Sequence, residues 1–204
     1  MSTSPSAPFL DAVATRRTIY TISNETTIPD SKIVEIVQHA VKHVPSSFNS
    51  QSSRAIVLFG DAHTKVWDIT LDILKARLPA DMYAYTEGKN KGFRAGYGTV
   101  LFFEDQTSVK GMQEKFPAYA AAFPVFSQHT SGMVQFVVWT ALEKEGLGAS
   151  LQHYNPLIDE EIRKAFDVPE SWQLVSQMPF GKPTADAGEK TFAPIDERVK
   201  VITA

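Results

Sequence analysis

The sequence predicts one α+β domain, and three observations support this. Helical and strand-like segments follow one another in the order helix, helix, strand, helix, strand, several helices, strand, strand. The chain shows no internal repeat and no shift in composition that would mark a second domain. Hydrophobic residues make up 43% of the 204 residues, enough for a buried core. We therefore expect one domain over residues 1–204, with a flexible start at 1–7 and an extended tail over about 181–204.

Two helices are expected before the first strand. Pro8 suits a first helical turn, and FLDAVATRR continues as a short helix. Asp30 can cap the second helix, whose apolar residues recur at helical spacing: Ile33, Ile36, Val37, Ala40 and Val44. The run AIVLFG is typical of a buried strand, and the helix after it is expected to begin at Asp61 and end at Pro79.

The second half of the chain predicts a longer series of elements. TVLFFED is expected to form a buried strand, and residues 105–128 favour two short helices broken at Pro117 and Pro124. GMVQFVVWTALEKEG is apolar almost all round, a pattern typical of a helix buried on every side, and a second subunit is one way to cover it. GASLQHY and SWQLVSQMPFG are expected strands, whereas the tail is too polar and Pro-rich for a core element.

Composition excludes several classes of protein. The net charge is -3 with both signs mixed along the chain, which argues against a nucleic-acid partner. No apolar run approaches the roughly 20 residues that cross a bilayer, and the first residues lack the pattern of a secretory signal. The chain has no cysteine, so disulfides and thiolate catalysis are excluded. We therefore expect a cytoplasmic protein without a nucleic-acid or membrane partner.

The common catalytic motifs do not account for the chain. It has no Gly-x-Ser-x-Gly and no phosphate loop, and Gly96-Tyr97-Gly98 precedes a strand instead of following one, which favours a turn. His39 and His43 are spaced like a pair of metal ligands, but two are too few, so no metal site is expected. The basic segment EGKNKGFR favours a solvated loop over a phosphate contact.

Three separated polar clusters remain as candidate binding residues. They are Arg16-Arg17-Thr18, the serine-rich stretch VPSSFNSQSSR, and Lys190 in the tail. Two arginines and a lysine together can neutralise a phosphate, since Arg offers a bidentate fork. The arginines are equally compatible with cations that stabilise a helix C-terminus. The serine-rich stretch suits either a solvated linker or a polar cradle for a ligand with several hydroxyls.

In this order the motifs resemble those of the nitroreductase-like flavoprotein family. RRTIY is similar to the family's N-terminal Arg-Arg/His-Ser motif, and PSSFNSQ to its Pro-Ser-Ser-x-Asn-Ser-Gln motif. GLGASLQHYN resembles the strand after the long interface helix, and EKTFAP the Lys-x-Arg-x-Pro ending. The chain is most similar to the short subgroup of copper-inducible bacterial nitroreductases and fungal fatty-acid-repression proteins.

The resemblance implies a fold, a cofactor and a set of site residues. The fold is a central, mainly antiparallel sheet flanked by helices, in a domain-entwined homodimer with two FMN sites at the interface. The residues that the motifs place on FMN are Arg16, Arg17, Thr18, Tyr20, Ser46, Ser47, Asn49, Gln51, Ala149, Leu151, Gln152, His153 and Lys190. Aromatic residues between 83 and 126, such as Tyr83, Tyr85, Phe93 and Phe123, are candidates to cover the flavin ring.

The chain departs from the family pattern at three places. Tyr20 replaces a Lys or Arg found in many members, Gln152-His153 replaces a Glu-Gly pair, and Phe192 stands where an Arg often assists the phosphate. None of these removes the site, but each is expected to shift the potential of the flavin.

The activity implied by the resemblance is NAD(P)H-dependent reduction of nitroaromatic compounds or quinones, in oxidative or metal stress defence. Hydride passes through flavin N5 in a ping-pong cycle, so no catalytic side chain is required. The alternative is a non-catalytic FMN-binding or lipid-responsive regulatory protein on the same fold.

Overall fold

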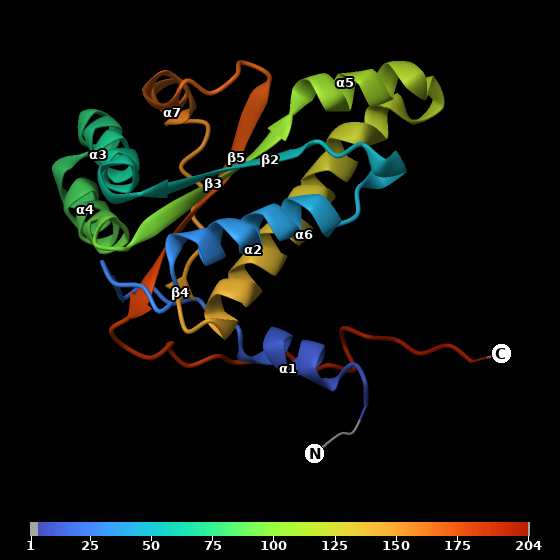
Figure 1. Cartoon of the computed structure of the whole chain (residues 1–204), viewed down its shortest axis with the longest axis horizontal. Coiled ribbons are helices and arrows are strands. Elements are labelled where there is room, and N and C mark those ends of the chain that lie inside the picture. Colours follow the sequence, from blue (N-terminus) through green and yellow to red (C-terminus); the bar gives the residue numbers. More distant parts are fainter. Residues whose placement is uncertain (1–3, 204) are drawn as a thin grey trace.

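The computed structural model describes residues 4–203 and has an α+β architecture, as predicted (Figure 1). Positions 1–3 of the expected flexible start lie outside the described residues, as does Ala204. No helix among the described residues is long and apolar enough to span a membrane.

The sheet is antiparallel at every pairing. Its strands are β1 (Ile22–Ser23), β2 (Ser53–Phe59), β3 (Gly98–Asp105), β4 (Gly148–Ala149) and β5 (Trp172–Pro183). The order is β1-β5-β3-β2, with β4 also paired to β5. β2 therefore ends the sheet, and its outer edge has no strand partner within residues 4–203.

Helices surround this sheet. They are α1 (Ala7–Thr15), α2 (Asp30–His43), α3 (Gly60–Arg77), α4 (Ala80–Arg94), α5 (Gln106–Lys115), α6 (Phe123–Lys144) and α7 (Asp159–Phe166), with short 3-10 turns at η1 (Ser47–Asn49) and η2 (Pro117–Ala122). In Figure 1, α2 and α6 lie side by side, as their contacts confirm, and α3 packs on α4.

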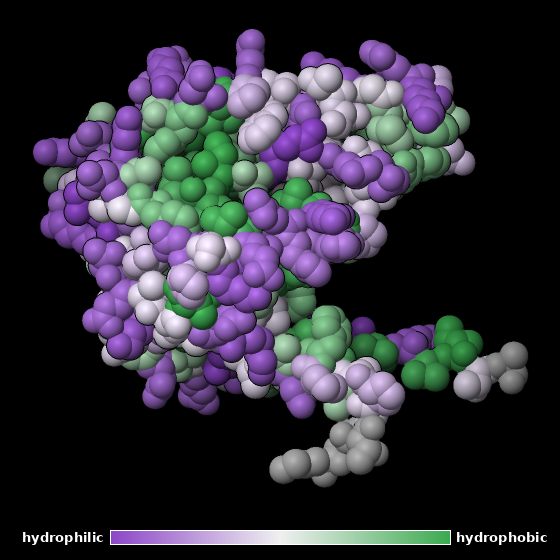
Figure 2. Space-filling view, viewed as in Figure 1, coloured by the Kyte–Doolittle hydropathy of each residue, from purple (hydrophilic) through white to green (hydrophobic). Residues whose placement is uncertain are grey.

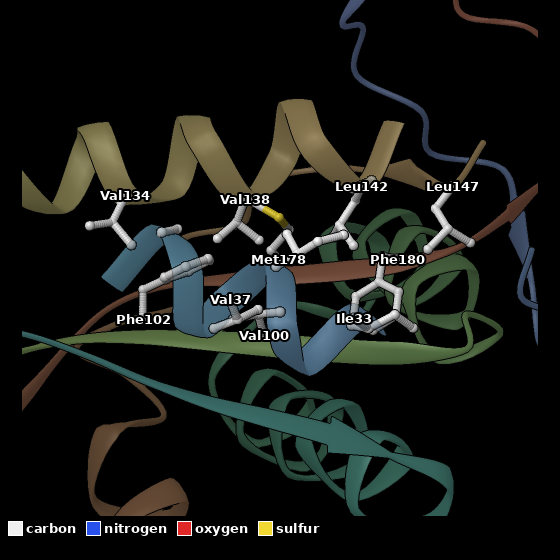
Figure 3. Packing of buried hydrophobic residues seen from close by; sticks show 13 residues of the cluster. Ile33, Val37, Val100, Phe102, Val134, Val138, Leu142, Leu147, Met178 and Phe180 are labelled. Carbon is white, nitrogen blue, oxygen red and sulfur yellow. The ribbon is translucent and has the colours of Figure 1, made fainter. Parts of the chain in front are cut away.

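The alternation of side chains along β3 creates two cores, because successive residues of a strand point to opposite faces. Val100 and Phe102 pack with α2 and α6, whereas Leu101 and Phe103 pack with α3, α4 and α7. Figure 3 shows the first core, in which side chains of α6 meet those of α2, β3 and β5. The sheet is thus a middle layer, and α6 is held firmly against it.

Several expected local features differ in the structure. Pro29, not Asp30, is the N-cap of α2, and the Asp30 carboxylate instead accepts a hydrogen bond from the Tyr97 hydroxyl at 2.6 Å. EGKNKGFR is part of α4, because Phe93 anchors that face against Trp67. Pro124 begins a helix and does not break one, since proline is tolerated in a first helical turn.

Two expected elements are less buried than their composition indicated. β2 has only two buried residues, Ser53 and Leu58, because it lies at the sheet edge. α6 is not covered on all sides: Val138 is fully buried, but Met133 is 41% exposed. The apolar face of α6 therefore remains partly open in a single chain.

The expected tail begins at residue 184, because β5 continues through Pro183. Over residues 184–203 it has no helix or strand, and it leaves the body on the side of α1 (Figure 1). Its large apolar side chains are exposed: Phe192, Ile195, Val199, Val201 and Ile202. An extended segment with this many exposed apolar groups lacks a core of its own.

Candidate functional site

A cavity of about 390 Å³ lies where the segment after α1 meets the C-terminal tail. It is lined by Arg16, Arg17, Thr18, Tyr20, Gly188, Glu189 and Lys190. Two of the three polar clusters singled out in the sequence therefore form one site, although more than 160 residues separate them along the 204-residue chain. The volume is within the range of small-molecule sites.

Arg16 is held in place by an aromatic ring, but two of its hydrogen-bond donors have no partner among the described residues. Its guanidinium carbon lies 4.4 Å from the centre of the Trp139 ring of α6. Its Nε and Nη1 atoms are buried and have no hydrogen-bond partner among the described residues. A buried donor without a hydrogen-bond partner destabilises the fold and is uncommon in proteins. The two unpartnered donors of Arg16 therefore indicate an anionic ligand.

Arg17 connects the tail to the body. Its guanidinium Nη2 donates to the carbonyl oxygen of Gly188, and its backbone N–H donates to Glu143 Oε2 at 2.6 Å. The first contact fixes the tail next to Lys190. Arg17 therefore has a structural task at this site in addition to its positive charge.

Glu143 organises the base of the cavity from the last turns of α6. Its carboxylate accepts the Arg17 backbone N–H and also the Trp139 Nε1–H, the latter at 2.9 Å. Burial raises the pKa of Glu143 above its ordinary value, although both donors and the two neighbouring arginines act in the opposite direction. The carboxylate fixes the backbone of the arginine segment through Arg17, although burial removes part of its own hydration.

The residues of the strand motif lie beside the arginine segment. The Ile19 backbone N–H donates to the Ala149 carbonyl oxygen at 3.0 Å, which places residues 16–20 next to β4. Ala149 is fully buried, whereas Leu151 and Gln152 are half-buried and His153 is exposed. The backbone N–H of Gln152 donates to Gln177 at 2.8 Å, so it already has a partner within the sheet.

The serine-rich segment over residues 46–51 forms η1 and a sharp turn. Phe48, Asn49 and Gln51 have positive φ angles of 53°, 54° and 48°. Asn49 and Gln51 are exposed, whereas Ser46 and Ser47 are half-buried, and Ser46 Oγ accepts the Gln51 backbone N–H at 3.0 Å. This segment is an ordered structure and not a flexible linker.

The serine-rich segment and the arginine cavity lie at opposite ends of α6. Phe48 packs on Phe123 at the start of α6, and Arg17 bonds Glu143 near its end. Twenty residues of helix separate Phe123 from Glu143, which corresponds to about 30 Å. One chain therefore does not bring all the predicted site residues around one small ligand.

The candidate aromatic residues divide into core and surface. Phe93 and Phe123 are buried, so they serve the core and do not offer a free ring face. Tyr85 is 70% exposed. Phe48, at the tip of the serine-rich segment, is also exposed and packs on Phe116 and Tyr119.

Sequence reasoning missed the supporting residues Trp139, Glu143 and Gly188. Their contacts with Arg16 and Arg17 span more than a hundred positions, and no local pattern marks them. Only the GLGASLQHYN motif after α6 indicated that the end of this helix borders the site.

A second hollow of about 600 Å³ lies between α2 and the open edge of β2. Apolar residues line much of it, including Val34, Val41, Ala55 and Val57, and Lys42 and Arg54 lie among them. Figure 2 shows apolar side chains gathered over β2, and apolar tail residues that stand away from the body. Both surfaces are available to another chain.

The arginine cavity fits the anionic end of FMN. It combines two arginines with a lysine, and it contains buried Arg16 donors that lack partners among residues 4–203. A phosphate accepts several charge-assisted hydrogen bonds at once, so it can satisfy these donors. Thr18 and Tyr20 add hydroxyl groups at the same cavity.

Comparisons with known proteins identify the family of the chain. A model of the nitroreductase family matches residues 13–182. The nitroreductase FRM2 of Saccharomyces cerevisiae is 40% identical over 194 residues, which cover 93% of this chain and 95% of that protein. Nitroreductase CinD from Lactococcus lactis in complex with chloramphenicol has a TM-score of 0.87 at 45% identity, covering 96% of this chain and 100% of that chain.

Two further structures extend the comparison. CinD has also been solved in complex with 4-nitrophenol, with the same TM-score of 0.87. A protein from Desulfovibrio desulfuricans in complex with FMN has a TM-score of 0.70 at 18% identity, covering 99% of each chain. This last likeness concerns the fold alone.

Proposed function

Because the chain belongs to the nitroreductase family, we propose that it is an FMN-dependent oxidoreductase that uses NADH or NADPH to reduce nitroaromatic compounds or quinones. The family assignment supports a flavin oxidoreductase, and the ligands of two CinD complexes, chloramphenicol and 4-nitrophenol, carry a nitrophenyl group, whereas a third complex holds nicotinic acid. The quinone and the nicotinamide donor follow from the family resemblance of the sequence motifs.

One observation carries the proposal: Arg16, which has two buried donors without a partner among the described residues, lines the same cavity as Lys190 from the other end of the chain. Within this proposal Arg16 and Lys190 bind the phosphate of FMN. Arg17 holds the tail in place through Gly188. Asn49 and Gln51 offer amide groups that suit the polar edge of a flavin.

Arg16, Lys190 and the serine-rich segment would hold FMN, which would supply the redox chemistry of hydride transfer from a nicotinamide to the acceptor. The side chains of this protein therefore have to bind and orient and need not supply a nucleophile. The positive charge of Arg16, Arg17 and Lys190 would also stabilise the reduced form of the flavin, which carries more negative charge.

The complete site requires two copies of the chain in this proposal. In one copy, the serine-rich segment and the arginine cavity lie about 30 Å apart along α6, which is longer than an FMN molecule. Two copies related by a two-fold axis, with their α6 helices antiparallel, bring each serine-rich segment toward the other copy's arginine cavity. The exposed Met133 on α6 supports such a contact.

The tail offers a second support for the homodimer. It exposes apolar residues, carries Asp196 and Glu197 beside Arg198 and Lys200, and runs away from its own body (Figure 1). The hollow beside β2 is apolar and contains Lys42 and Arg54. Both surfaces are apolar, so a partner's tail suits this hollow.

Steady-state turnover tests the activity. Purified protein loaded with FMN should oxidise NADH or NADPH in the presence of 4-nitrophenol or a benzoquinone faster than the same concentration of free FMN. A rate equal to that of free FMN would contradict the proposed activity and leave a flavin-binding protein without turnover.

A further inference from the structure

A fully buried carboxylate lies directly behind the serine-rich segment. Glu104 of β3 has no exposed surface and accepts three serine hydroxyl hydrogen bonds. Ser52 Oγ donates to Oε2 at 2.5 Å, Ser53 Oγ donates to Oε1 at 2.6 Å, and Ser127 Oγ donates to Oε2 at 2.6 Å. A buried carboxylate persists only where hydrogen bonds compensate its desolvation, so this cluster is a built feature of the fold.

The donors tie three elements together. Ser52 follows Gln51 directly, Ser53 begins β2, and Ser127 belongs to the first turns of α6. The Ser52 carbonyl oxygen also accepts the backbone N–H of Asp105 at 2.8 Å, which adds a backbone contact beside the carboxylate. The end of the serine-rich segment is therefore fixed to both β3 and α6.

The segment held in this way has a strained backbone. Phe48, Asn49 and Gln51 all have positive φ angles, a conformation that residues with a side chain seldom adopt. Such strain persists only where the surrounding structure enforces it. Inside the segment, Ser46 accepts the backbone N–H groups of Asn49 and Gln51. Outside it, the Arg54 guanidinium donates to the Gln51 carbonyl oxygen at 2.7 Å, Phe48 packs on Phe123, and Glu104 holds the adjoining Ser52.

We propose that Glu104 is a positioning residue for the flavin site: through Ser52, which adjoins Gln51, its carboxylate helps to hold residues 46–51 in the strained conformation that presents Asn49 and Gln51. The role of Glu104 in flavin binding rests on the proposed function. The link between Glu104 and residues 46–51 rests on its hydrogen bond with Ser52 and does not depend on flavin. Ser52 and Ser53 turn their hydroxyls inward to this carboxylate, so they serve the anchor and not the ligand.

Hydrogen exchange of the flavin-free protein tests the anchor directly. Glu104→Gln keeps the shape of the side chain but removes the charge that strengthens the three hydrogen bonds. Amides of Asn49, Ser50 and Gln51 should exchange about tenfold faster than in the wild type, as expected from the loss of one charge-assisted hydrogen bond. Amides of α3 should be unchanged. Unchanged exchange in residues 46–51 would overturn the proposal.

Two serine variants test the same anchor independently, including the case in which Glu104→Gln does not fold. Ser52→Ala and Ser127→Ala each remove one hydroxyl from the same carboxylate oxygen. Ser52 adjoins the segment and Ser127 does not, so Ser52→Ala should accelerate exchange in residues 46–51 more strongly. Equal effects of the two variants would assign the cluster to general stability and overturn the proposal.

Flavin binding tests whether Glu104 affects the ligand site through residues 46–51. Glu104→Gln should weaken FMN and riboflavin by the same factor, about tenfold, and should change the visible absorption spectrum of the bound flavin. The same factor is expected because the phosphate contacts lie at Arg16 and Lys190. If the segment exchanges faster but the wild type binds neither flavin, the proposed function fails and the anchor stands. If the segment exchanges faster but flavin binding is unchanged, the positioning role is overturned.

Discussion

The backbone N–H of Arg17 donates to Glu143 Oε2 at 2.6 Å and joins the arginine segment to the end of α6. The same carboxylate accepts the Nε1–H of Trp139, whose ring lies under the Arg16 guanidinium. The position of both arginines therefore depends on one side chain of α6. Because that helix also carries the core contacts of Val138 and Leu142, the cavity is built on a rigid element.

The raised pKa of Glu143 predicts a pH-dependent contribution to stability. Since burial is the main cause and raises the pKa above 4.5, the folded chain holds this proton more tightly than the unfolded chain. The contribution is therefore complete below pH 4.5 and is lost as the pH rises through the higher folded-state pKa. Glu143→Gln removes this titration.

Urea unfolding at several pH values between 4 and 8 measures this effect. The difference in unfolding free energy, wild type minus Glu143→Gln, should decrease as the pH rises. A difference that stays constant, or increases with pH, would show that burial does not govern this carboxyl group.

Lys190 should contribute to FMN binding through its charge. Lys190→Gln keeps a long polar side chain but removes the cation, and we expect FMN affinity to fall by about tenfold, the typical value of one charge-assisted contact. Lys200→Gln, a second tail lysine that does not line the cavity, is the control and should bind FMN as the wild type does. Equal losses in both variants would indicate a general charge effect.

The exposed face of α6 should control dimerisation. Met133→Asp places a charge on this face, so sedimentation should show monomers, together with weaker FMN binding, because each site needs two copies. Met82→Asp is the matched control, since Met82 is 56% exposed on α4 and lies away from α6. A Met133→Asp protein that stays dimeric would contradict the proposed packing of α6. Val138 is unsuitable for this test because it is buried in the core.

Much of the fold was predictable because local patterns decided it. The apolar run within residues 99–105 predicted β3, and the helical spacing from Ile33 to Ala40 predicted α2. α4 was missed because its sequence is polar and contains Gly88 and Gly92. It forms a helix through the packing of Phe93 on Trp67, a tertiary contact that no local pattern reveals.

The sequence indicated the cations that line the candidate site, but not the side chains that support them. Arg16, Arg17 and Lys190 carried a chemical signal, and the structure brings them to one cavity. Glu104 and Glu143 carried none, because a single Glu in a strand or helix has the same sequence pattern whether it is buried or solvated. Their partners lie 51 or more positions away, with the exception of Ser127 and Trp139.

In the proposed function, Arg16 and its neighbours bind the phosphate of FMN. Equilibrium titration of flavin-free protein with FMN and with riboflavin tests this most directly, since the two ligands differ only in the phosphate. The wild type should bind FMN more tightly, and Arg16→Ala should lose about tenfold or more in FMN affinity while its riboflavin affinity changes little. Arg77→Ala, on the exposed end of α3, should behave as the wild type. Equal weakening of FMN and riboflavin by Arg16→Ala would contradict the claim.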